Sequence, residues 1–136
     1  MYDTELVWLF TGRSLLYLIN MKNTITKFSH AFRGIFYALA NDRSYRVQVY
    51  LIGAIVVGVF VYFDPLERWE VLFVLLAYTL MLVTELQNSA FEAALDRMHP
   101  ERHDDIGRSK DMAAGAVLTA SAFLVLVIGS LIFGRL

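Results

Sequence analysis

Three long stretches of the chain contain no charged residue, and shorter charged segments separate them. They run from Val47 to Phe63, from Val71 to Thr84 and from Met112 to Phe133. A helix needs about 20 mostly apolar residues to cross the hydrocarbon core of a bilayer. The third stretch is long enough by itself, the first is slightly short, and the second must include the polar residues that follow it. The pattern predicts an all-α membrane protein with spans at about residues 47–63, 70–96 and 111–134.

A different pattern precedes the first span, because apolar residues there recur at the spacing of one helix face. This stripe consists of Phe28, Ala31, Phe32, Ile35, Phe36 and Leu39. Lys27, His30 and Arg33 lie off the stripe. A basic amphipathic helix beside a span is typical of a helix that lies in the membrane interface. Packing against the membrane-spanning helices is a compatible alternative.

The composition supports a membrane protein and excludes several other classes. Hydrophobic residues make up 57% of the chain and charged residues 18%, whereas soluble domains are nearer to about a half and about a quarter. The formal net charge of -1 provides no electrostatic attraction for nucleic acid. Because the chain contains no cysteine, disulfides, thiolate chemistry and cysteine-based zinc sites are excluded.

Residues 1–20 fit the rest of the pattern poorly. Gly12 and Arg13 interrupt their apolar character, and the small-residue cleavage site of a signal peptide is missing. Met21 begins a second plausible N-terminus. We therefore expect residues 1–20 to be an N-terminal extension, either from an upstream start or as a loose interfacial segment, and residues 21–136 to form the membrane domain.

Lysine and arginine are concentrated in two of the polar segments. Five lie between Lys22 and Arg46, and four lie between Arg97 and Lys110. The turn at residues 64–70 contains only one, beside several acids. Because short cytoplasmic segments carry an excess of basic residues, the first two segments are expected in the cytoplasm and the turn outside.

A row of polar residues follows the second uncharged stretch on the same predicted helix. Glu85, Asn88, Ser89, Glu92 and Asp96 fall within an arc of about 100° on that helix. A carboxylate at membrane depth costs on the order of 2.5–3.5 kcal/mol, and neighbouring carboxylates need a cation or a proton between them. Oxygen ligands of this kind suit Mg²⁺. The row predicts an active site; the alternatives are ordinary surface acids on a water-exposed helix end and an ion or proton pathway.

Two further polar clusters lie at the same predicted membrane face. One runs from Asn41 to Arg46, and the other, from Gly107 to Asp111, is expected to open the third span. Cations at a helix start are unfavourable with the helix dipole, so an anion such as phosphate would explain Arg108 and Lys110. The positive-inside rule alone is the simpler alternative.

Motifs of the common soluble kinases, including the P-loop, do not occur in the sequence. The run from Glu85 to Ala93, followed by Asp96 and Arg97, closely resembles a signature of the bacterial integral-membrane diacylglycerol kinase family, which includes the undecaprenol kinases. The run from Lys110 to Leu118 resembles the family's second signature. The resemblance covers about residues 22–134.

The resemblance implies a homotrimer in the bacterial plasma membrane, with an interfacial helix and three spans per protomer and an active site at the cytoplasmic face. Three spans alone form a thin bundle, which also favours a homo-oligomer. Small residues between Ala113 and Ala122 permit close helix packing. The implied reaction moves the γ-phosphoryl group of MgATP to a lipid hydroxyl. The Glu-Leu-Gln-Asn-Ser-Ala form of the motif favours diacylglycerol, giving phosphatidic acid, with undecaprenol as the alternative. A small ion or proton transporter and a membrane scaffold are the non-enzymatic alternatives.

The resemblance also implies roles for individual residues. Glu85 matches the family's general base, Glu92 matches a metal-binding acid, and Asp42 stands where the family usually has a glutamate ligand. The positions that match nucleotide contacts are Lys110, Asp111, Glu101, Arg102, His103 and His30, the last replacing an aromatic residue that is commonly Tyr. The positions expected to contact or orient the substrates are Asn88, Ser89, Asn41 and Arg46.

Overall fold

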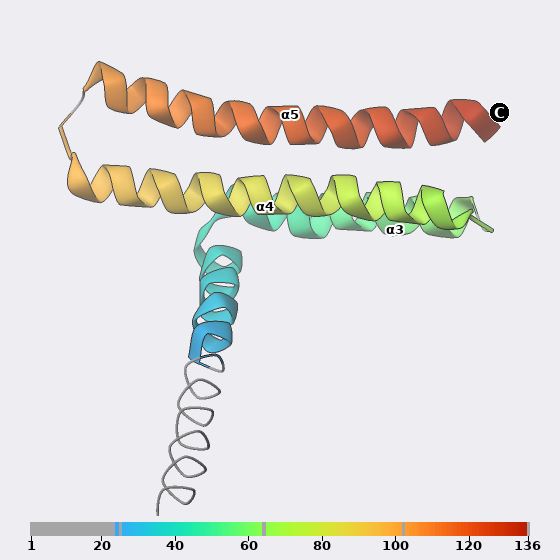
Figure 1. Ribbon diagram of the computed structural model, residues 1–136, viewed down its shortest axis with the longest axis horizontal. Coiled ribbons are helices and arrows are strands. Elements are labelled where there is room, and N and C mark those ends of the chain that lie inside the picture. The colour runs from blue at the N-terminus through green and yellow to red at the C-terminus, as the bar shows by residue number, and fades with distance from the viewer. Residues whose placement is uncertain (1–23, 25, 64, 102, 136) are drawn as a thin grey trace, which may run out of the picture. The chain divides into compact units, whose positions relative to one another are not determined.

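The computed structural model describes residues 24, 26–63, 65–101 and 103–135. Every regular element in these residues is a helix, which confirms the predicted all-α fold for this part of the chain (Figure 1). Residues 26–41 are helical, and the described residues as far as Tyr37 belong to a unit separate from the one that begins at Ala38. The labelled elements are α2 (Arg43–Val47), the π-helical turn η1 (Gln48–Ile52), α3 (Gly53–Tyr62), α4 (Arg68–Met98) and α5 (Asp104–Arg135). The predicted extension at residues 1–20 lies outside the described residues.

Three helical segments are long and apolar enough to cross a membrane, as the sequence predicted. They are Arg43–Tyr62, which passes through α2, η1 and α3, and the whole of α4 and α5. Large apolar side chains on their outer surfaces are exposed, such as Leu72 at 66% and Leu118 at 72%. Exposed apolar surface on this scale suits contact with lipid or with other membrane helices rather than with water.

α4 begins earlier and ends later than the predicted span at residues 70–96. At its start, the Glu67 side chain accepts a backbone N–H from Glu70, and the Glu70 side chain accepts one from Glu67. This capping box satisfies two N–H groups that would otherwise lack partners. The helix ends at Met98, shortly before Pro100, because the residue before a proline is disfavoured in helical conformation.

α5 begins at Asp104, earlier than the Gly107–Asp111 cluster that the sequence predicted to open the third span. Asp104 and Asp105 occupy its first turn, where negative charge interacts favourably with the helix dipole. Arg108 and Lys110 therefore lie beyond the first turn, where the dipole effect has largely faded. The prediction that these two cations open the helix, and need an anion for that reason, is wrong.

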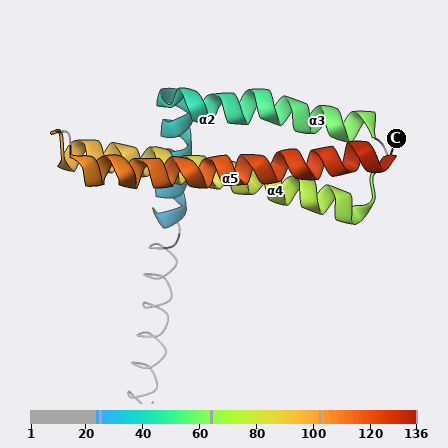
Figure 2. The same cartoon turned by 90° about the horizontal axis from the view of Figure 1, so that it is seen from above.

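α4 packs against both α3 and α5 (Figures 1 and 2). The buried side chains form two clusters, one of Val56, Val59, Val74 and Leu131, and one of Ala77, Met81, Ala120 and Leu124. In the second cluster, Ala77 and Ala120 allow the backbones of α4 and α5 to approach closely. This packing holds the polar half of α4 beside both the start of the first span and the start of α5.

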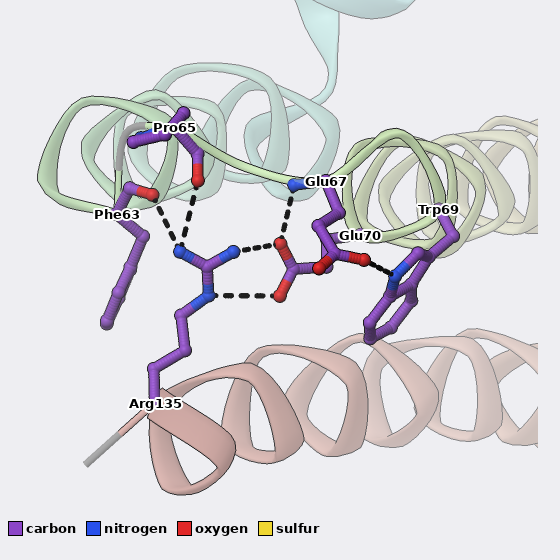
Figure 3. A network of polar contacts seen from close by, with 6 residues as sticks. All are labelled: Phe63, Pro65, Glu67, Trp69, Glu70 and Arg135. Atoms are coloured by element: carbon purple, nitrogen blue, oxygen red, sulfur yellow. Dashed lines mark hydrogen bonds and ion pairs between the residues drawn. The ribbon is translucent and has the colours of Figure 1, made fainter.

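Arg135 joins the end of α5 to the turn between α3 and α4 (Figure 3). Its Nε donates to Glu70 Oε1 at 3.0 Å, and its Nη2 pairs with the second carboxylate oxygen. Its Nη1 donates to the carbonyl oxygens of Phe63 at 3.1 Å and Pro65 at 3.2 Å. The Glu67 amide donates to Glu70 at 2.7 Å. The buried Glu70 carboxylate is therefore bonded by groups from two helices.

Replacing Arg135 by Gln is expected to lower the thermal midpoint of the protein in detergent. The change removes the cation and leaves a buried carboxylate without its charged partner, which is strongly destabilising. Arg68→Gln is the matched control, because Arg68 is exposed beside the same turn. We expect a several-fold larger fall for the Arg135 variant, followed by circular dichroism. Equal falls of the thermal midpoint in the two variants would show that the Arg135 network stabilises the protein no more than an exposed arginine does.

Candidate active site

The row of polar residues predicted from the sequence lies on one continuous helix, α4. Burial decreases along the row: Glu85 is only 4% exposed, Asn88, Ser89 and Glu92 are half-buried, and Asp96 is exposed. The deepest acid is thus removed from solvent by the fold of a single chain. Asp96, at the other end, is accessible to water.

The start of the first span meets this row at Asp42. One carboxylate oxygen of Asp42 accepts the Tyr45 backbone N–H at 3.1 Å and caps α2. The other oxygen accepts a hydrogen bond from the Ser89 hydroxyl. Two segments that are 47 residues apart in the chain are therefore joined at this point.

The pKa of Asp42 lies below its ordinary value. Burial raises it, but hydrogen bonds from Ser89, Tyr45 and Ser44, together with the charge of Arg46, outweigh the burial and lower the pKa. Asp42 is therefore ionised at neutral pH. Arg46 itself donates to the carbonyl oxygens of Ala40 at 2.5 Å and Leu39 at 3.5 Å, so it binds the end of the preceding helical segment.

Glu85 is surrounded by polar groups from both helices. The side-chain amide of Gln48 lies in hydrogen-bonding reach of its carboxylate, and the charges of Asp42 and Glu92 are close enough to act on it. Asn88 Nδ2 donates to Glu92 Oε1 at 3.3 Å. The side-chain oxygens of Asn88 and Gln48 are buried and accept no hydrogen bond from any described residue.

The oxygen atoms gathered here have the chemistry of a Mg²⁺ site, which uses hard oxygen ligands. Asp42 and Glu92 supply carboxylates, and the buried Asn88 oxygen has an unused acceptor. Among the described residues, no group of three or more acidic, histidine or cysteine side chains could hold a metal. A set of two carboxylates fits Mg²⁺ all the same, because this ion commonly keeps waters and binds substrate phosphates.

α5 contributes a cation and a groove beside the row. Lys110 Nζ pairs with the Asp96 carboxylate. Asp111 is exposed on the same helix. A groove of ≈ 370 Å³ between α4 and α5 is lined by Thr84, Gln87, Asn88, Phe91, Ser109, Met112, Ala113 and Ala116. The groove therefore gives an accessible apolar surface next to the polar side chain of Asn88.

The structure does not bring all the predicted residues to the row. Glu101 and His103 are both exposed in the connection between α4 and α5. His103 accepts a hydrogen bond from the Asp105 backbone N–H at 3.3 Å. Arg102 lies outside the described residues. His30 belongs to the separate N-terminal unit, where it contacts Arg33. Asn41 is exposed at the end of the helical residues 26–41.

Sequence reasoning missed Gln48 and Tyr78. Gln48 approaches Glu85, and the Tyr78 hydroxyl donates to the backbone of η1, 3.1 Å from the Val49 carbonyl oxygen. The signal for Gln48 was present, since it is the one amide in an otherwise apolar uncharged stretch. The pattern of Tyr78 is that of any aromatic residue in a span, so its contact could not be predicted.

Comparison with known proteins shows similarity to one family over most of the chain, including the residues of the candidate site. Residues 29–133 match the family described as prokaryotic diacylglycerol kinase. The chain is 31% identical to the diacylglycerol kinase of Synechocystis, over 81% of this chain and 62% of that protein. It is 30% identical to the diacylglycerol kinase of Haemophilus influenzae, over 88% of this chain and 94% of that protein. It is 31% identical to the undecaprenol kinase of Bacillus subtilis, over 78% of this chain and 84% of that protein.

The match contains both halves of the site, Asp42 before the first span and the polar row on α4, together with Lys110 on α5. It also contains the three helices that can cross a membrane, apart from the last residues of α5. The family match and the helical architecture therefore agree. This chain belongs to the prokaryotic diacylglycerol kinase family.

Proposed function

We propose that this protein, an ATP-dependent lipid kinase by its family, transfers the γ-phosphoryl group of ATP to the hydroxyl of diacylglycerol and releases phosphatidic acid and ADP. The observation that carries the proposal is the hydrogen bond between Ser89 of the polar row and Asp42, next to the buried carboxylate of Glu85. Relatives named diacylglycerol kinase support this acceptor. The undecaprenol kinase of Bacillus subtilis supports undecaprenol as the second candidate.

Glu85 is proposed as the general base. The lipid hydroxyl oxygen forms a bond to the γ-phosphorus, and the bond from this phosphorus to the bridging oxygen of ADP breaks. The hydroxyl proton passes to the Glu85 carboxylate. Burial suits Glu85 for this role, because a carboxylate removed from water is less stabilised as an anion and becomes a better base. A deep position also suits an acceptor that arrives from the bilayer.

Asp42 and Glu92, with the oxygen of Asn88, are proposed to hold Mg²⁺. When bound, the ion would neutralise charge on the transferring phosphoryl group, which is the main requirement of this chemistry. Ser89 holds the Asp42 carboxylate toward the row. Asn88 holds Glu92 through its amide, which leaves the Asn88 oxygen available as a ligand.

Lys110 is proposed to contact the nucleotide phosphates. It now pairs with the exposed Asp96, so it can exchange one anionic partner for another without leaving a buried charge unpaired. The remaining nucleotide contacts proposed are Asp111, Glu101, Arg102, His103 and His30. Asn41 and Arg46 are proposed to orient the substrates. Arg46 supports such a role because it braces the backbone just before Asp42.

The protein is proposed to act as a homotrimer in the bacterial plasma membrane, with its site at the cytoplasmic face. The exposed apolar faces of its membrane-capable helices support assembly. The distribution of lysine and arginine supports the orientation. The helical residues 26–41 are proposed to lie in the membrane interface, because Phe28, Phe32 and Phe36 are all exposed on one side of that helix.

The test is phosphate transfer from labelled ATP to lipid by the purified protein in mixed micelles. We expect product that requires Mg²⁺, with a larger kcat/KM for diacylglycerol than for undecaprenol. A mock preparation from cells that do not express the protein, purified in the same way, controls for a contaminating kinase. Absence of product with both lipids would contradict the kinase function. A preference for undecaprenol would overturn only the choice of acceptor.

A further inference from the structure

A π-helical turn interrupts the first span beside the candidate active site. Residues Gln48–Ile52 form η1, between α2 and α3. Single π-helical turns inside α-helices are rare and often occur at functional sites. At the end of this turn the Gly53 N–H donates to the Gln48 carbonyl oxygen five residues earlier. The wider turn changes the direction in which the side chains of Gln48 and its neighbours point from the helix axis.

Tyr78 of α4 binds this turn directly. Its hydroxyl lies 3.1 Å from the Val49 carbonyl oxygen and 3.3 Å from the Gln48 carbonyl oxygen, and it can donate its proton to either. Bonding a side chain to these carbonyls joins α4 to the backbone of the first span. Tyr78 is thus the α4 side chain whose hydroxyl is hydrogen-bonded to the backbone of the π-helical turn.

Gly53 makes this approach possible. A Cβ atom at this position would lie 2.8 Å from the Tyr78 hydroxyl oxygen and 3.6 Å from Cζ of the ring. The first distance is too short for any real contact, whereas the second is ordinary packing. A side chain at residue 53 would therefore push the Tyr78 hydroxyl away from the turn, and the ring to which this oxygen is fixed would tilt with it.

The same helix face of α4 continues from Tyr78 to Glu85. The two residues are seven positions apart, which is about two helical turns, so both side chains point toward the first span. Tyr78 contacts the backbone of Gln48, and Glu85 is reached by the side chain of Gln48. One residue of the first span therefore links the two.

We propose that Tyr78 is a positioning residue, whose hydroxyl holds the π-helical turn so that the Gln48 amide orients the Glu85 carboxylate. This inference rests on the proposed function, in which Glu85 receives the proton of the lipid hydroxyl. A general base must lie within hydrogen-bond reach of the proton that it takes, so a small rotation of its carboxylate lowers the rate of the chemical step. Tyr78 would act on kcat without contacting ATP or lipid.

The first test measures kcat and KM of Tyr78→Phe, which removes only the hydroxyl. We expect kcat to fall about tenfold, the change for about 1.4 kcal/mol, the scale of one hydrogen bond, while KM for MgATP stays the same. Gln48→Leu should lower kcat at least as much. Adding Tyr78→Phe to Gln48→Leu should cost nothing more, because Tyr78 acts through Gln48. Tyr50→Phe, an exposed tyrosine of the same turn, should leave kcat unchanged.

The second test separates positioning from a merely structural role. Gly53→Ala gains helix propensity, which offsets the similar loss of the Tyr78 hydrogen bond, so its thermal midpoint should stay close to that of the wild type. Because the new Cβ displaces the Tyr78 hydroxyl, kcat should nevertheless fall about tenfold, as in Tyr78→Phe. In the Tyr78→Phe background, Gly53→Ala should have no further effect on kcat.

Several outcomes would overturn the inference. Wild-type kcat in Tyr78→Phe would remove the positioning role, and so would a full additional loss when it is combined with Gln48→Leu. A kcat that falls only in proportion to the thermal midpoint would show a structural role alone. If the wild-type protein phosphorylates no lipid, the proposed function fails first; an active wild type with an equally active Tyr78→Phe sinks only this inference.

Discussion

Replacing Glu85 by Gln is expected to lower kcat by about 10²–10⁴-fold, the range that general acid–base catalysis contributes. The amide cannot accept the proton of the lipid hydroxyl, although it has nearly the same shape as the carboxylate. Glu85 is only 4% exposed, so water has little access to substitute for it as a base. We expect no change in helix content or in the oligomeric state, because replacing a buried acid by a neutral amide removes a charge that is costly to bury.

Steady-state kinetics in mixed micelles measure this loss, and circular dichroism and size-exclusion chromatography check the fold. Glu67→Gln is the matched control, since it makes the same chemical change at the opposite end of α4, where the side chain is exposed. That variant should retain wild-type kcat. Wild-type turnover in Glu85→Gln would exclude Glu85 as the base, and the catalytic proton acceptor would have to be sought elsewhere in the row.

Replacing Asp42 by Asn is expected to lower kcat/KM by at least about 100-fold at limiting Mg²⁺, the upper end of what ligand-supporting groups contribute. Asparagine caps a helix about as well as aspartate, so α2 should keep its N-terminal cap. What disappears is the negative charge. Since the pKa of Asp42 is lowered, wild-type Asp42 keeps that charge at neutral pH and loses it only as the pH falls through the lowered pKa.

A titration of activity with Mg²⁺ at pH 7 separates loss of the ligand from loss of the cap. We expect the Asn variant to need more Mg²⁺ and Asp42→Glu to stay close to wild type, because glutamate retains the carboxylate. Ser89→Ala should show a smaller version of the same shift, because it removes only the hydrogen bond that orients Asp42. An unchanged Mg²⁺ titration in Asp42→Asn would remove Asp42 from the metal site.

Much of the fold could be predicted from the pattern of charged and uncharged residues. Membrane spans are recognisable because a helix must satisfy its own backbone hydrogen bonds in lipid and must be apolar outside. The helix ends were less predictable. The sequence pattern placed the start of the third span near residue 111, but the acids Asp104 and Asp105 stabilise an earlier start in the structure.

The candidate site was predictable where it lies on one element. Helical spacing alone places Glu85, Asn88 and Ser89 on one face, and the structure confirms that they share α4. The contacts of Gln48 and Tyr78 were not predictable, because they depend on where another helix passes. The sequence near Gln48 contains no pattern that predicts a π-helical turn. The need for glycine at residue 53 is visible only once the position of the Tyr78 hydroxyl is known.

The sequence by itself determined the class of the protein: three membrane-capable helices, a row of polar residues on the second, and a match to the prokaryotic diacylglycerol kinase family over residues 29–133. These properties are local, since hydropathy and helical period are set by neighbours along the chain. Only the tertiary structure decided which groups meet. Packing of α4 against its neighbours buries Glu85, brings Asp42 to Ser89 and sets Tyr78 on the π-helical turn. Such contacts join residues far apart in the chain, where no periodicity links them.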